Sequence, residues 1–126
     1  MLPKVIYAVV FASLSFKGAS QNANRYLKCV RNSDVSGLAE DFNNSIQLST
    51  PGKDGFYSKS QAKSIIGYFF NNHNPTRVKI ADKGQSPNGG RFVELRTCTN
   101  RGEFDISIFY RVSESESQIH EIKIQK

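Results

Sequence analysis

The chain has 126 residues, which leaves room for one hydrophobic core and argues against a multidomain protein. Its nine Phe and five Tyr, within an apolar fraction of 38%, exclude an intrinsically disordered chain. The formal charge of +6 comes from Lys and Arg residues scattered along the chain. Because no basic run is present that would follow a phosphate backbone, nucleic acid is not an expected partner.

Residues 1–20 have the order of a secretory signal peptide. Lys4 precedes an apolar run at residues 5–16, and small residues follow at 18–20. The run stops short of the roughly 20 apolar residues that a membrane-spanning helix needs. We therefore expect this segment to be removed on export, which leaves a single domain, residues 21–126, periplasmic or secreted and without a membrane span. The alternative is that the segment remains as a buried helix or strand.

The mature chain begins with helical spacing and changes later to strand-like spacing, with no linker between the two parts. Two short helices or one bent helix are predicted near its start, and Ser33 or Asp34 is suited to cap the second. A short strand at Ile46 and Leu48 and a turn over residues 50–55 come next. The residues that set the helical spacing are Ala23, Leu27, Val30, Leu38 and Phe42.

The clearest helix in the sequence begins at Ser58. Ser58 and Gln61 have the spacing of a capping box, in which each side chain binds a free backbone N–H at the helix start. The helix is expected to end at Asn74, because the residue before Pro75 avoids helical dihedral angles. One face is apolar and must pack on the rest of the domain, through Ala62, Ile65, Ile66, Phe69 and Phe70.

From Thr76 onward apolar residues alternate with polar ones, which predicts four strands joined into an antiparallel meander. A two-residue turn at Arg101 and Gly102 would pair Val93 with Tyr110 and keep the apolar side chains on one face. The alternating residues are Val78 and Ile80, then Val93, Leu95 and Thr97, then Phe104, Ile106, Ile108, Tyr110 and Val112, and finally Ile122 and Ile124.

Helices followed by a curled antiparallel meander form the α+β architecture of nuclear transport factor two-like (cystatin-like) domains, a cone in which N-terminal helices pack on a curved sheet. The motifs YSKSQA (57–62), FF (69–70) and IHEIKI (119–124) resemble, in this order, a family of small exported bacterial proteins of unknown function. The resemblance covers essentially the whole mature chain and implies the fold and export. It implies no activity, because the family has no established catalytic residues.

Pockets in this fold commonly open between the helix layer and the concave face of the sheet. We expect Tyr110, His120, Thr97 and Phe70 to line such a pocket, since strand alternation puts His120 on the same side as Ile122. A cavity histidine can act as an acid or a base near neutral pH. The simpler interpretation is a core histidine held by one hydrogen bond.

Phe92 and Phe109 are expected on the outer face of the sheet. Neighbouring aromatic side chains at that position could form a homodimer interface, or they could simply cover the sheet.

The sequence offers no convincing catalytic or metal site. An isomerase or hydratase of this fold needs an inward carboxylate, but Glu103 and Asp105 alternate outward and Asp41 is expected on a solvated helix surface. No nucleophile-elbow, HExxH or phosphate-loop motif is present, and neither a metal nor a cofactor is expected. Cys29 and Cys98 could form a disulfide in an oxidising compartment, although Cys98 is expected on the sheet face away from the helices.

Three function classes follow from these features. The leading expectation is a non-catalytic module that binds a small-molecule ligand in a cavity between helix and sheet. The alternatives are a structural or dimerising module that uses the outer sheet face, and a small isomerase- or hydratase-like enzyme.

Overall fold

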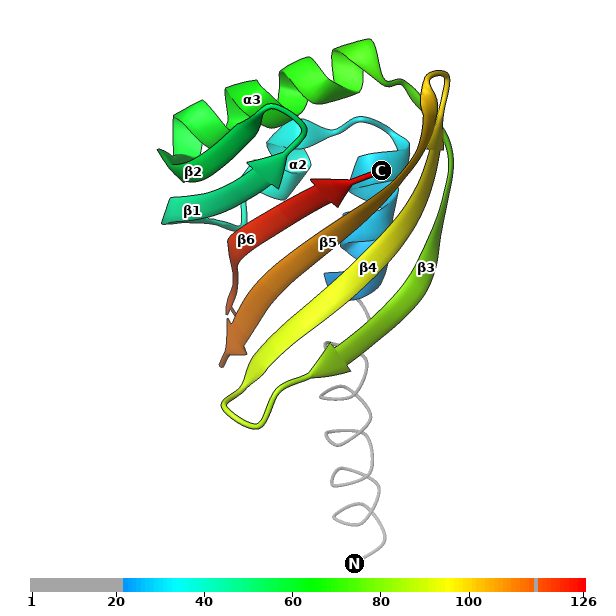
Figure 1. Cartoon of the computed structure of the whole chain (residues 1–126). Helices are drawn as coiled ribbons and strands as arrows, with labels where there is room; N and C mark the ends of the chain where they lie inside the picture. The colour runs from blue at the N-terminus through cyan, green and yellow to red at the C-terminus, as the bar shows by residue number, and fades with distance from the viewer. Residues whose placement is uncertain (1–21, 115) are drawn as a thin grey trace, which may run out of the picture.

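The computed structural model describes residues 22–114 and 116–126, so the expected signal peptide lies outside the described residues. A first helix covers residues 22–31. The remaining elements, in chain order, are α2 (Val35–Ala39), β1 (Phe42–Thr50), β2 (Lys53–Ser58), α3 (Lys59–Asn72), β3 (Pro75–Gln85), β4 (Gly90–Thr99), β5 (Gly102–Ser113) and β6 (Glu116–Gln125) (Figure 1).

The six strands form one curved sheet in the order β2-β1-β6-β5-β4-β3 (Figure 1). Strands β3 to β6 pair antiparallel in chain order, which confirms the predicted meander. Strand β1 pairs in parallel with β6, and β2 completes a hairpin at the sheet edge. The first helix and α2 lie behind the sheet in Figure 1, whereas α3 lies along β1, β2 and α2. The predicted α+β architecture, with helices packed on a curved sheet, is confirmed, and the sheet is antiparallel except where β1 pairs with β6.

Helix α3 has the predicted start and the predicted inner face. The Ser58 hydroxyl accepts a hydrogen bond from the Gln61 N–H (3.2 Å), and the Gln61 side chain accepts one from the Ser58 N–H (3.1 Å). The helix ends at Asn72, shortly before Pro75 begins β3. Its buried residues are Ala62, Ile66, Phe69 and Phe70. Among residues 22–114 and 116–126, no helix has the length and apolar character that crossing a membrane requires.

Two predictions for the first half of the chain are wrong. The helical spacing predicts Phe42 on a helix, but Phe42 begins β1, because the carbonyl of Asp41 already accepts a hydrogen bond from the Ile119 N–H of β6 (2.6 Å). The predicted turn over residues 50–55 is also too long. Strand pairing resumes at residue 53, so only Pro51 and Gly52 turn the chain, and Gly52 adopts a φ of 94° that favours glycine.

The turn between β4 and β5 is formed by Asn100 and Arg101, one residue earlier than predicted. The Thr99 hydroxyl organises this turn, since it accepts a hydrogen bond from the Arg101 N–H (3.0 Å) and donates one to the Gly102 carbonyl (2.8 Å). Asn100 is also held in place, because its N–H donates to the Asn74 carbonyl (3.1 Å). These local contacts outweigh the simple preference for glycine within the turn.

The earlier turn changes the register of the hairpin. Val93 pairs with Ile108 and not, as predicted, with Tyr110. Because the shift is two residues, each side chain keeps its predicted face of the sheet.

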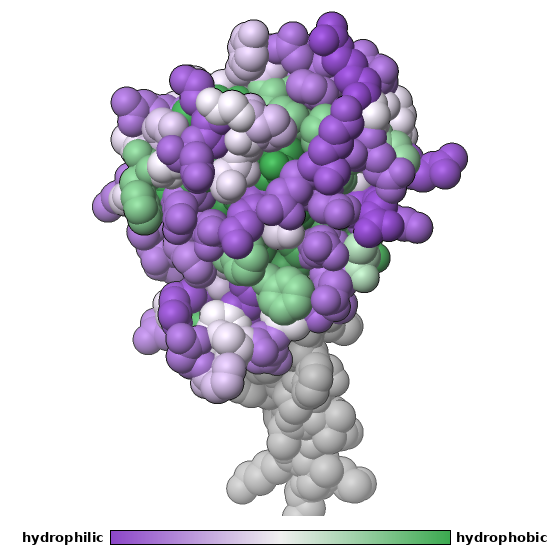
Figure 2. Space-filling model, in the orientation of Figure 1, coloured by the Kyte–Doolittle hydropathy of each residue, from purple (hydrophilic) through white to green (hydrophobic). Residues whose placement is uncertain are grey.

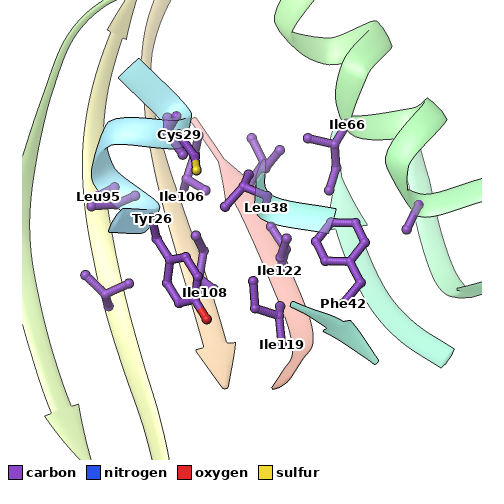
Figure 3. Close-up of a cluster of buried hydrophobic side chains, with 14 of the residues drawn as sticks. Tyr26, Cys29, Leu38, Phe42, Ile66, Leu95, Ile106, Ile108, Ile119 and Ile122 are labelled. Atoms are coloured by element: carbon purple, nitrogen blue, oxygen red, sulfur yellow. The ribbon is translucent and has the colours of Figure 1, made fainter. Parts of the chain in front are cut away.

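One core fills the space between the helices and the inner face of the sheet (Figure 3). Burying a large aliphatic side chain contributes about 1.5–3 kcal/mol, so this cluster supplies much of the stability. Side chains from the first helix, α2, α3 and five strands meet in it, and those less than 2% exposed include Tyr26, Leu38, Ile66, Leu95, Ile108, Ile119 and Ile122.

Candidate functional site

The interior between the helices and the sheet, where the ligand cavity is expected, contains protein side chains. Tyr110, Thr97 and Phe70 are all at most 3% exposed. The ring of Tyr26 packs edge-on against Tyr110, with 5.1 Å between ring centroids. Burial raises the pKa of the Tyr110 phenol, and the nearby Arg91 opposes this only partly. Tyr110 also lines a recess of about 250 Å³ between Ala23 of the first helix and strands β3 to β5, beside Arg91.

A polar cluster connects the first helix with Asp41, just before β1, and with Ser117 of β6. The Tyr26 hydroxyl donates a hydrogen bond to Asp41 Oδ2 (2.7 Å) and is 2.7 Å from Ser117 Oγ. Arg25 forms an ion pair with the same Asp41 oxygen, and the Asp41 side chain is only 14% exposed. The expectation that Asp41 lies on a solvated helix surface is therefore wrong, because Arg25 and Tyr26 draw its carboxylate inward.

This cluster clamps the first helix to the turn that precedes β1 and to β6. Burial raises the pKa of the Tyr26 phenol far above its ordinary value, and its hydrogen bond from Ser117 opposes that shift. With one oxygen of Asp41 holding two donors, the carboxylate is already committed to structural contacts. The sequence pattern contained a signal for Tyr26, since it lies at helical spacing from Ala23 and Val30.

His120 occupies a β-bulge in β6. Phe109 pairs with Glu121 and Tyr110 pairs with Ile119, so His120 is an extra residue without a partner of its own across the ladder. The bulge breaks the alternation, and His120 does not share the inner side with Ile122 as predicted. It lines a recess on the outer face, so the structure does not bring His120 together with Tyr110.

Phe92 and Phe109 lie next to each other on the outer face of the sheet. Their ring centroids are 6.3 Å apart, and both rings are partly buried. Lys123 Nζ lies 5.5 Å from the centroid of the Phe109 ring. Figure 2 shows this face, where green apolar side chains over the lower part of β4 and β5 are surrounded by purple polar ones.

The outer-face recess beside this aromatic pair has a volume of about 240 Å³. We define it by six of its lining residues, which come from β4, β5, β6 and the connection before β4: Asn88, Arg91, Phe92, Phe109, Arg111 and His120.

A larger groove lies between α3 and the turn that joins β1 to β2. This α3 groove has a volume of about 580 Å³. Its lining is mostly apolar, and Tyr68 projects from it with 73% of its surface exposed. We define the groove by Pro51, Lys53, Ile65, Tyr68, Phe69 and His73.

His73 forms a fixed wall of the α3 groove. Its ring stacks on Phe69 with 4.3 Å between centroids and meets Phe104 edge-on at 5.1 Å. Its Nδ1 donates a hydrogen bond to the Phe69 carbonyl (3.0 Å). Sequence reasoning missed this groove, although Tyr68 gave a signal as an aromatic residue on the polar face of an amphipathic helix.

Neither cysteine is bridged. Cys29 is buried, which raises the pKa of its thiol, and Cys98 is partly exposed. In the part of the chain that the structure describes, no three His, Cys, Asp or Glu side chains gather as a metal site would require.

Helices packed on a six-stranded curved sheet form the nuclear transport factor two-like (NTF2-like) fold, and solved structures support this assignment. An NTF2-like protein of unknown function from Silicibacter pomeroyi DSS-3 has a TM-score of 0.64 at 10% identity, with 90% of this chain and 97% of that chain covered. The chain belongs to the family described as "Domain of unknown function (DUF4783)", whose model matches residues 23–125. The predicted resemblance to a family of unknown function is thus confirmed.

Two crystal structures of DUF4783 family proteins are similar to this chain. The protein from Bacteroides ovatus ATCC 8483 has a TM-score of 0.74 at 19% identity, covering 81% of this chain and 92% of that chain. The protein from Bacteroides uniformis ATCC 8492 has the same TM-score at 21% identity, covering 82% and 94%. No curated protein matches the sequence. At these identities the likeness establishes the fold alone.

Proposed function

We propose that this protein is a non-catalytic binding module that holds an uncharged, apolar small molecule in the α3 groove. The observation that carries the proposal is the exposed Tyr68 ring beside a mostly apolar groove of about 580 Å³. Pockets that bind small molecules commonly have volumes of about 300–1,000 Å³ and mainly apolar walls.

The groove is better suited to a ligand than the interior. Tyr26 is completely buried against Tyr110, so the recess beside Tyr110 measures only about 250 Å³, less than half the volume of the α3 groove. In the groove, His73 and Phe69 form a wall whose position is set by ring stacking and by a hydrogen bond to the backbone. Tyr68 adds a ring that is free to stack on a ligand.

The test uses a neutral dye whose fluorescence rises in apolar surroundings, such as N-phenyl-1-naphthylamine. Tyr68→Ser should weaken dye binding several-fold, because the groove loses its exposed aromatic wall. Phe56→Ser is the matched control, since Phe56 is 74% exposed, nearly the same as Tyr68, but lies in β2 outside the groove lining. Equal binding by wild type and Tyr68→Ser, or equal loss in both variants, would show that the groove is not the site.

We also propose that the protein is exported after removal of residues 1–20. Support comes from the order of a basic residue, an apolar run and small residues in the sequence. Mass spectrometry of the protein recovered outside the cytoplasm should find Gln21 at its N-terminus. Recovery from the cytoplasm with Met1 or Leu2 at the start would contradict export.

Dimerisation through the outer face is the second candidate, favoured by the Phe92 and Phe109 pair on an accessible surface. Light scattering should then detect a dimer of the wild type and a monomer of Phe109→Glu, and a wild-type monomer would remove this candidate. An isomerase- or hydratase-like activity has weaker support, because Asp41 already holds Arg25 and Tyr26.

A further inference from the structure

We propose that the outer-face recess binds a small organic anion, a single ring that carries a carboxylate or a phosphate group. This site is separate from the α3 groove, with which it shares no lining residue. It does not depend on the function proposed above.

Positive charge at the recess is not neutralised by the protein. Arg91 and Arg111 both line it, and among the described residues neither forms an ion pair. No Asp or Glu lines the recess within that part of the chain. An anion is therefore the complementary ligand, since charge-assisted hydrogen bonds from Arg to carboxylate or phosphate are among the strongest in proteins.

One of these guanidinium groups is held in position before any ligand arrives. Arg111 Nη1 donates a hydrogen bond to the Asn88 carbonyl (2.9 Å) in the connection between β3 and β4. A guanidinium has five N–H donors, so most remain available for an acceptor in the recess. Because the side chain is already anchored, less entropy is lost when it binds an anion.

The bulged histidine supplies a second polar group. His120 Nδ1 is shielded from solvent and has no hydrogen-bond partner among the described residues. A buried polar atom without a partner is destabilising, and an acceptor or donor from outside the chain can satisfy it. Bulges often redirect a side chain at a binding site, and here the bulge moves His120 from the inner face to the recess.

Two aromatic rings give the recess its apolar part. Phe92 and Phe109 lie 6.3 Å apart and both line it. A cavity of about 150 Å³ holds a benzene ring, so the roughly 240 Å³ here leaves room for one ring and an anionic group. Lys123 lies near Phe109 but is 3.9 Å from Glu121, so it contributes little net charge.

Nuclear magnetic resonance titration of the protein tests the proposal with phenyl phosphate and benzoate as probes. Benzyl alcohol is the neutral control, and inorganic phosphate is the control without a ring. We expect backbone shifts at Phe92, Phe109 and His120 with at least one of the two anions, and binding that weakens as the ionic strength rises. The comparison of the two anions decides between phosphate and carboxylate.

Variants then assign the binding to named side chains. Arg111→Gln should raise the Kd of the better anion at least about tenfold, as expected for the loss of a charge-assisted hydrogen bond. Arg77→Gln is the matched control, because Arg77 is an exposed residue of β3 that does not line the recess, and its Kd should be unchanged. Phe109→Leu keeps an apolar side chain but removes the ring, and it should weaken phenyl phosphate more than inorganic phosphate.

Several results would overturn the proposal. Benzyl alcohol binding as tightly as the anions would remove the role of charge, and inorganic phosphate binding as tightly as phenyl phosphate would remove the role of the rings. Equal losses in Arg111→Gln and Arg77→Gln would show only general attraction to a basic protein. If no anion binds and the shifts depend on protein concentration, the face is an interface between copies of this chain. Tyr68→Ser should leave anion binding intact, so failure here is distinct from failure of the α3 groove.

Discussion

Removal of the Tyr26 hydroxyl by Tyr26→Phe tests the polar clamp between the first helix and the sheet. The substitution keeps the ring that packs on Tyr110 and removes two contacts of 2.7 Å, to Asp41 Oδ2 and Ser117 Oγ. A hydrogen bond to a charged group contributes about 1.5–3 kcal/mol, and Asp41 keeps Arg25 as its remaining partner. We therefore expect the free energy of unfolding to fall by about 2 kcal/mol.

Urea unfolding followed by far-ultraviolet circular dichroism measures this loss, and the slope with urea should be unchanged. Tyr68→Phe is the matched control, because that side chain is 73% exposed and its loss should stay below about 0.5 kcal/mol. The double variant Tyr26→Phe with Asp41→Asn should lose less than the sum of the single variants, since the two groups are in contact. A loss for Tyr26→Phe no greater than that for Tyr68→Phe would refute the clamp.

Three further predictions concern pH, the start of α3 and the core. Burial raises the pKa of the Tyr26 phenol above its ordinary value of 10.0, so the folded state holds this proton more tightly than the unfolded state. The free energy of unfolding should therefore be retained below pH 10 and fall above it by up to about 1.4 kcal/mol per pH unit. Urea unfolding at a series of pH values should show a shallower fall for Tyr26→Phe. Ser58→Ala removes the capping box and should lower the free energy of unfolding by about 1 kcal/mol. Ser64→Ala, on the exposed side of the same helix, should change this free energy little. Equal effects of the two substitutions would contradict the role of Ser58 as a cap. Ile108→Ala leaves a cavity at a fully buried position and should cost about 2–5 kcal/mol in chemical unfolding, and a cost below 1 kcal/mol would mean that the core is loosely packed there.

Elements with strong local signals were predictable. The capping residues Ser58 and Gln61 and the apolar stripe that ends at Phe70 determine α3 through interactions within one segment. Alternation from Val78 to Ile124 likewise determines the strands of the meander and the faces of most of their side chains. The turn between β4 and β5 was predicted one residue too late, yet the predicted faces were still correct. A register shift of two residues leaves each side chain on the same face of the sheet.

Only the tertiary structure decided the candidate sites, because each depends on contacts between distant segments. The bulge at His120 arises from pairing with β5 and moves the histidine to the outer face, which alternation along β6 alone cannot indicate. Asp41 is drawn inward by Arg25 and Tyr26 from the first helix. The sequence by itself determined that a long amphipathic helix and an alternating sheet would bury one apolar face each. Packing of the first helix then decided that Tyr26 fills the centre of the interior, which leaves accessible recesses beside Tyr110, at α3 and on the outer face.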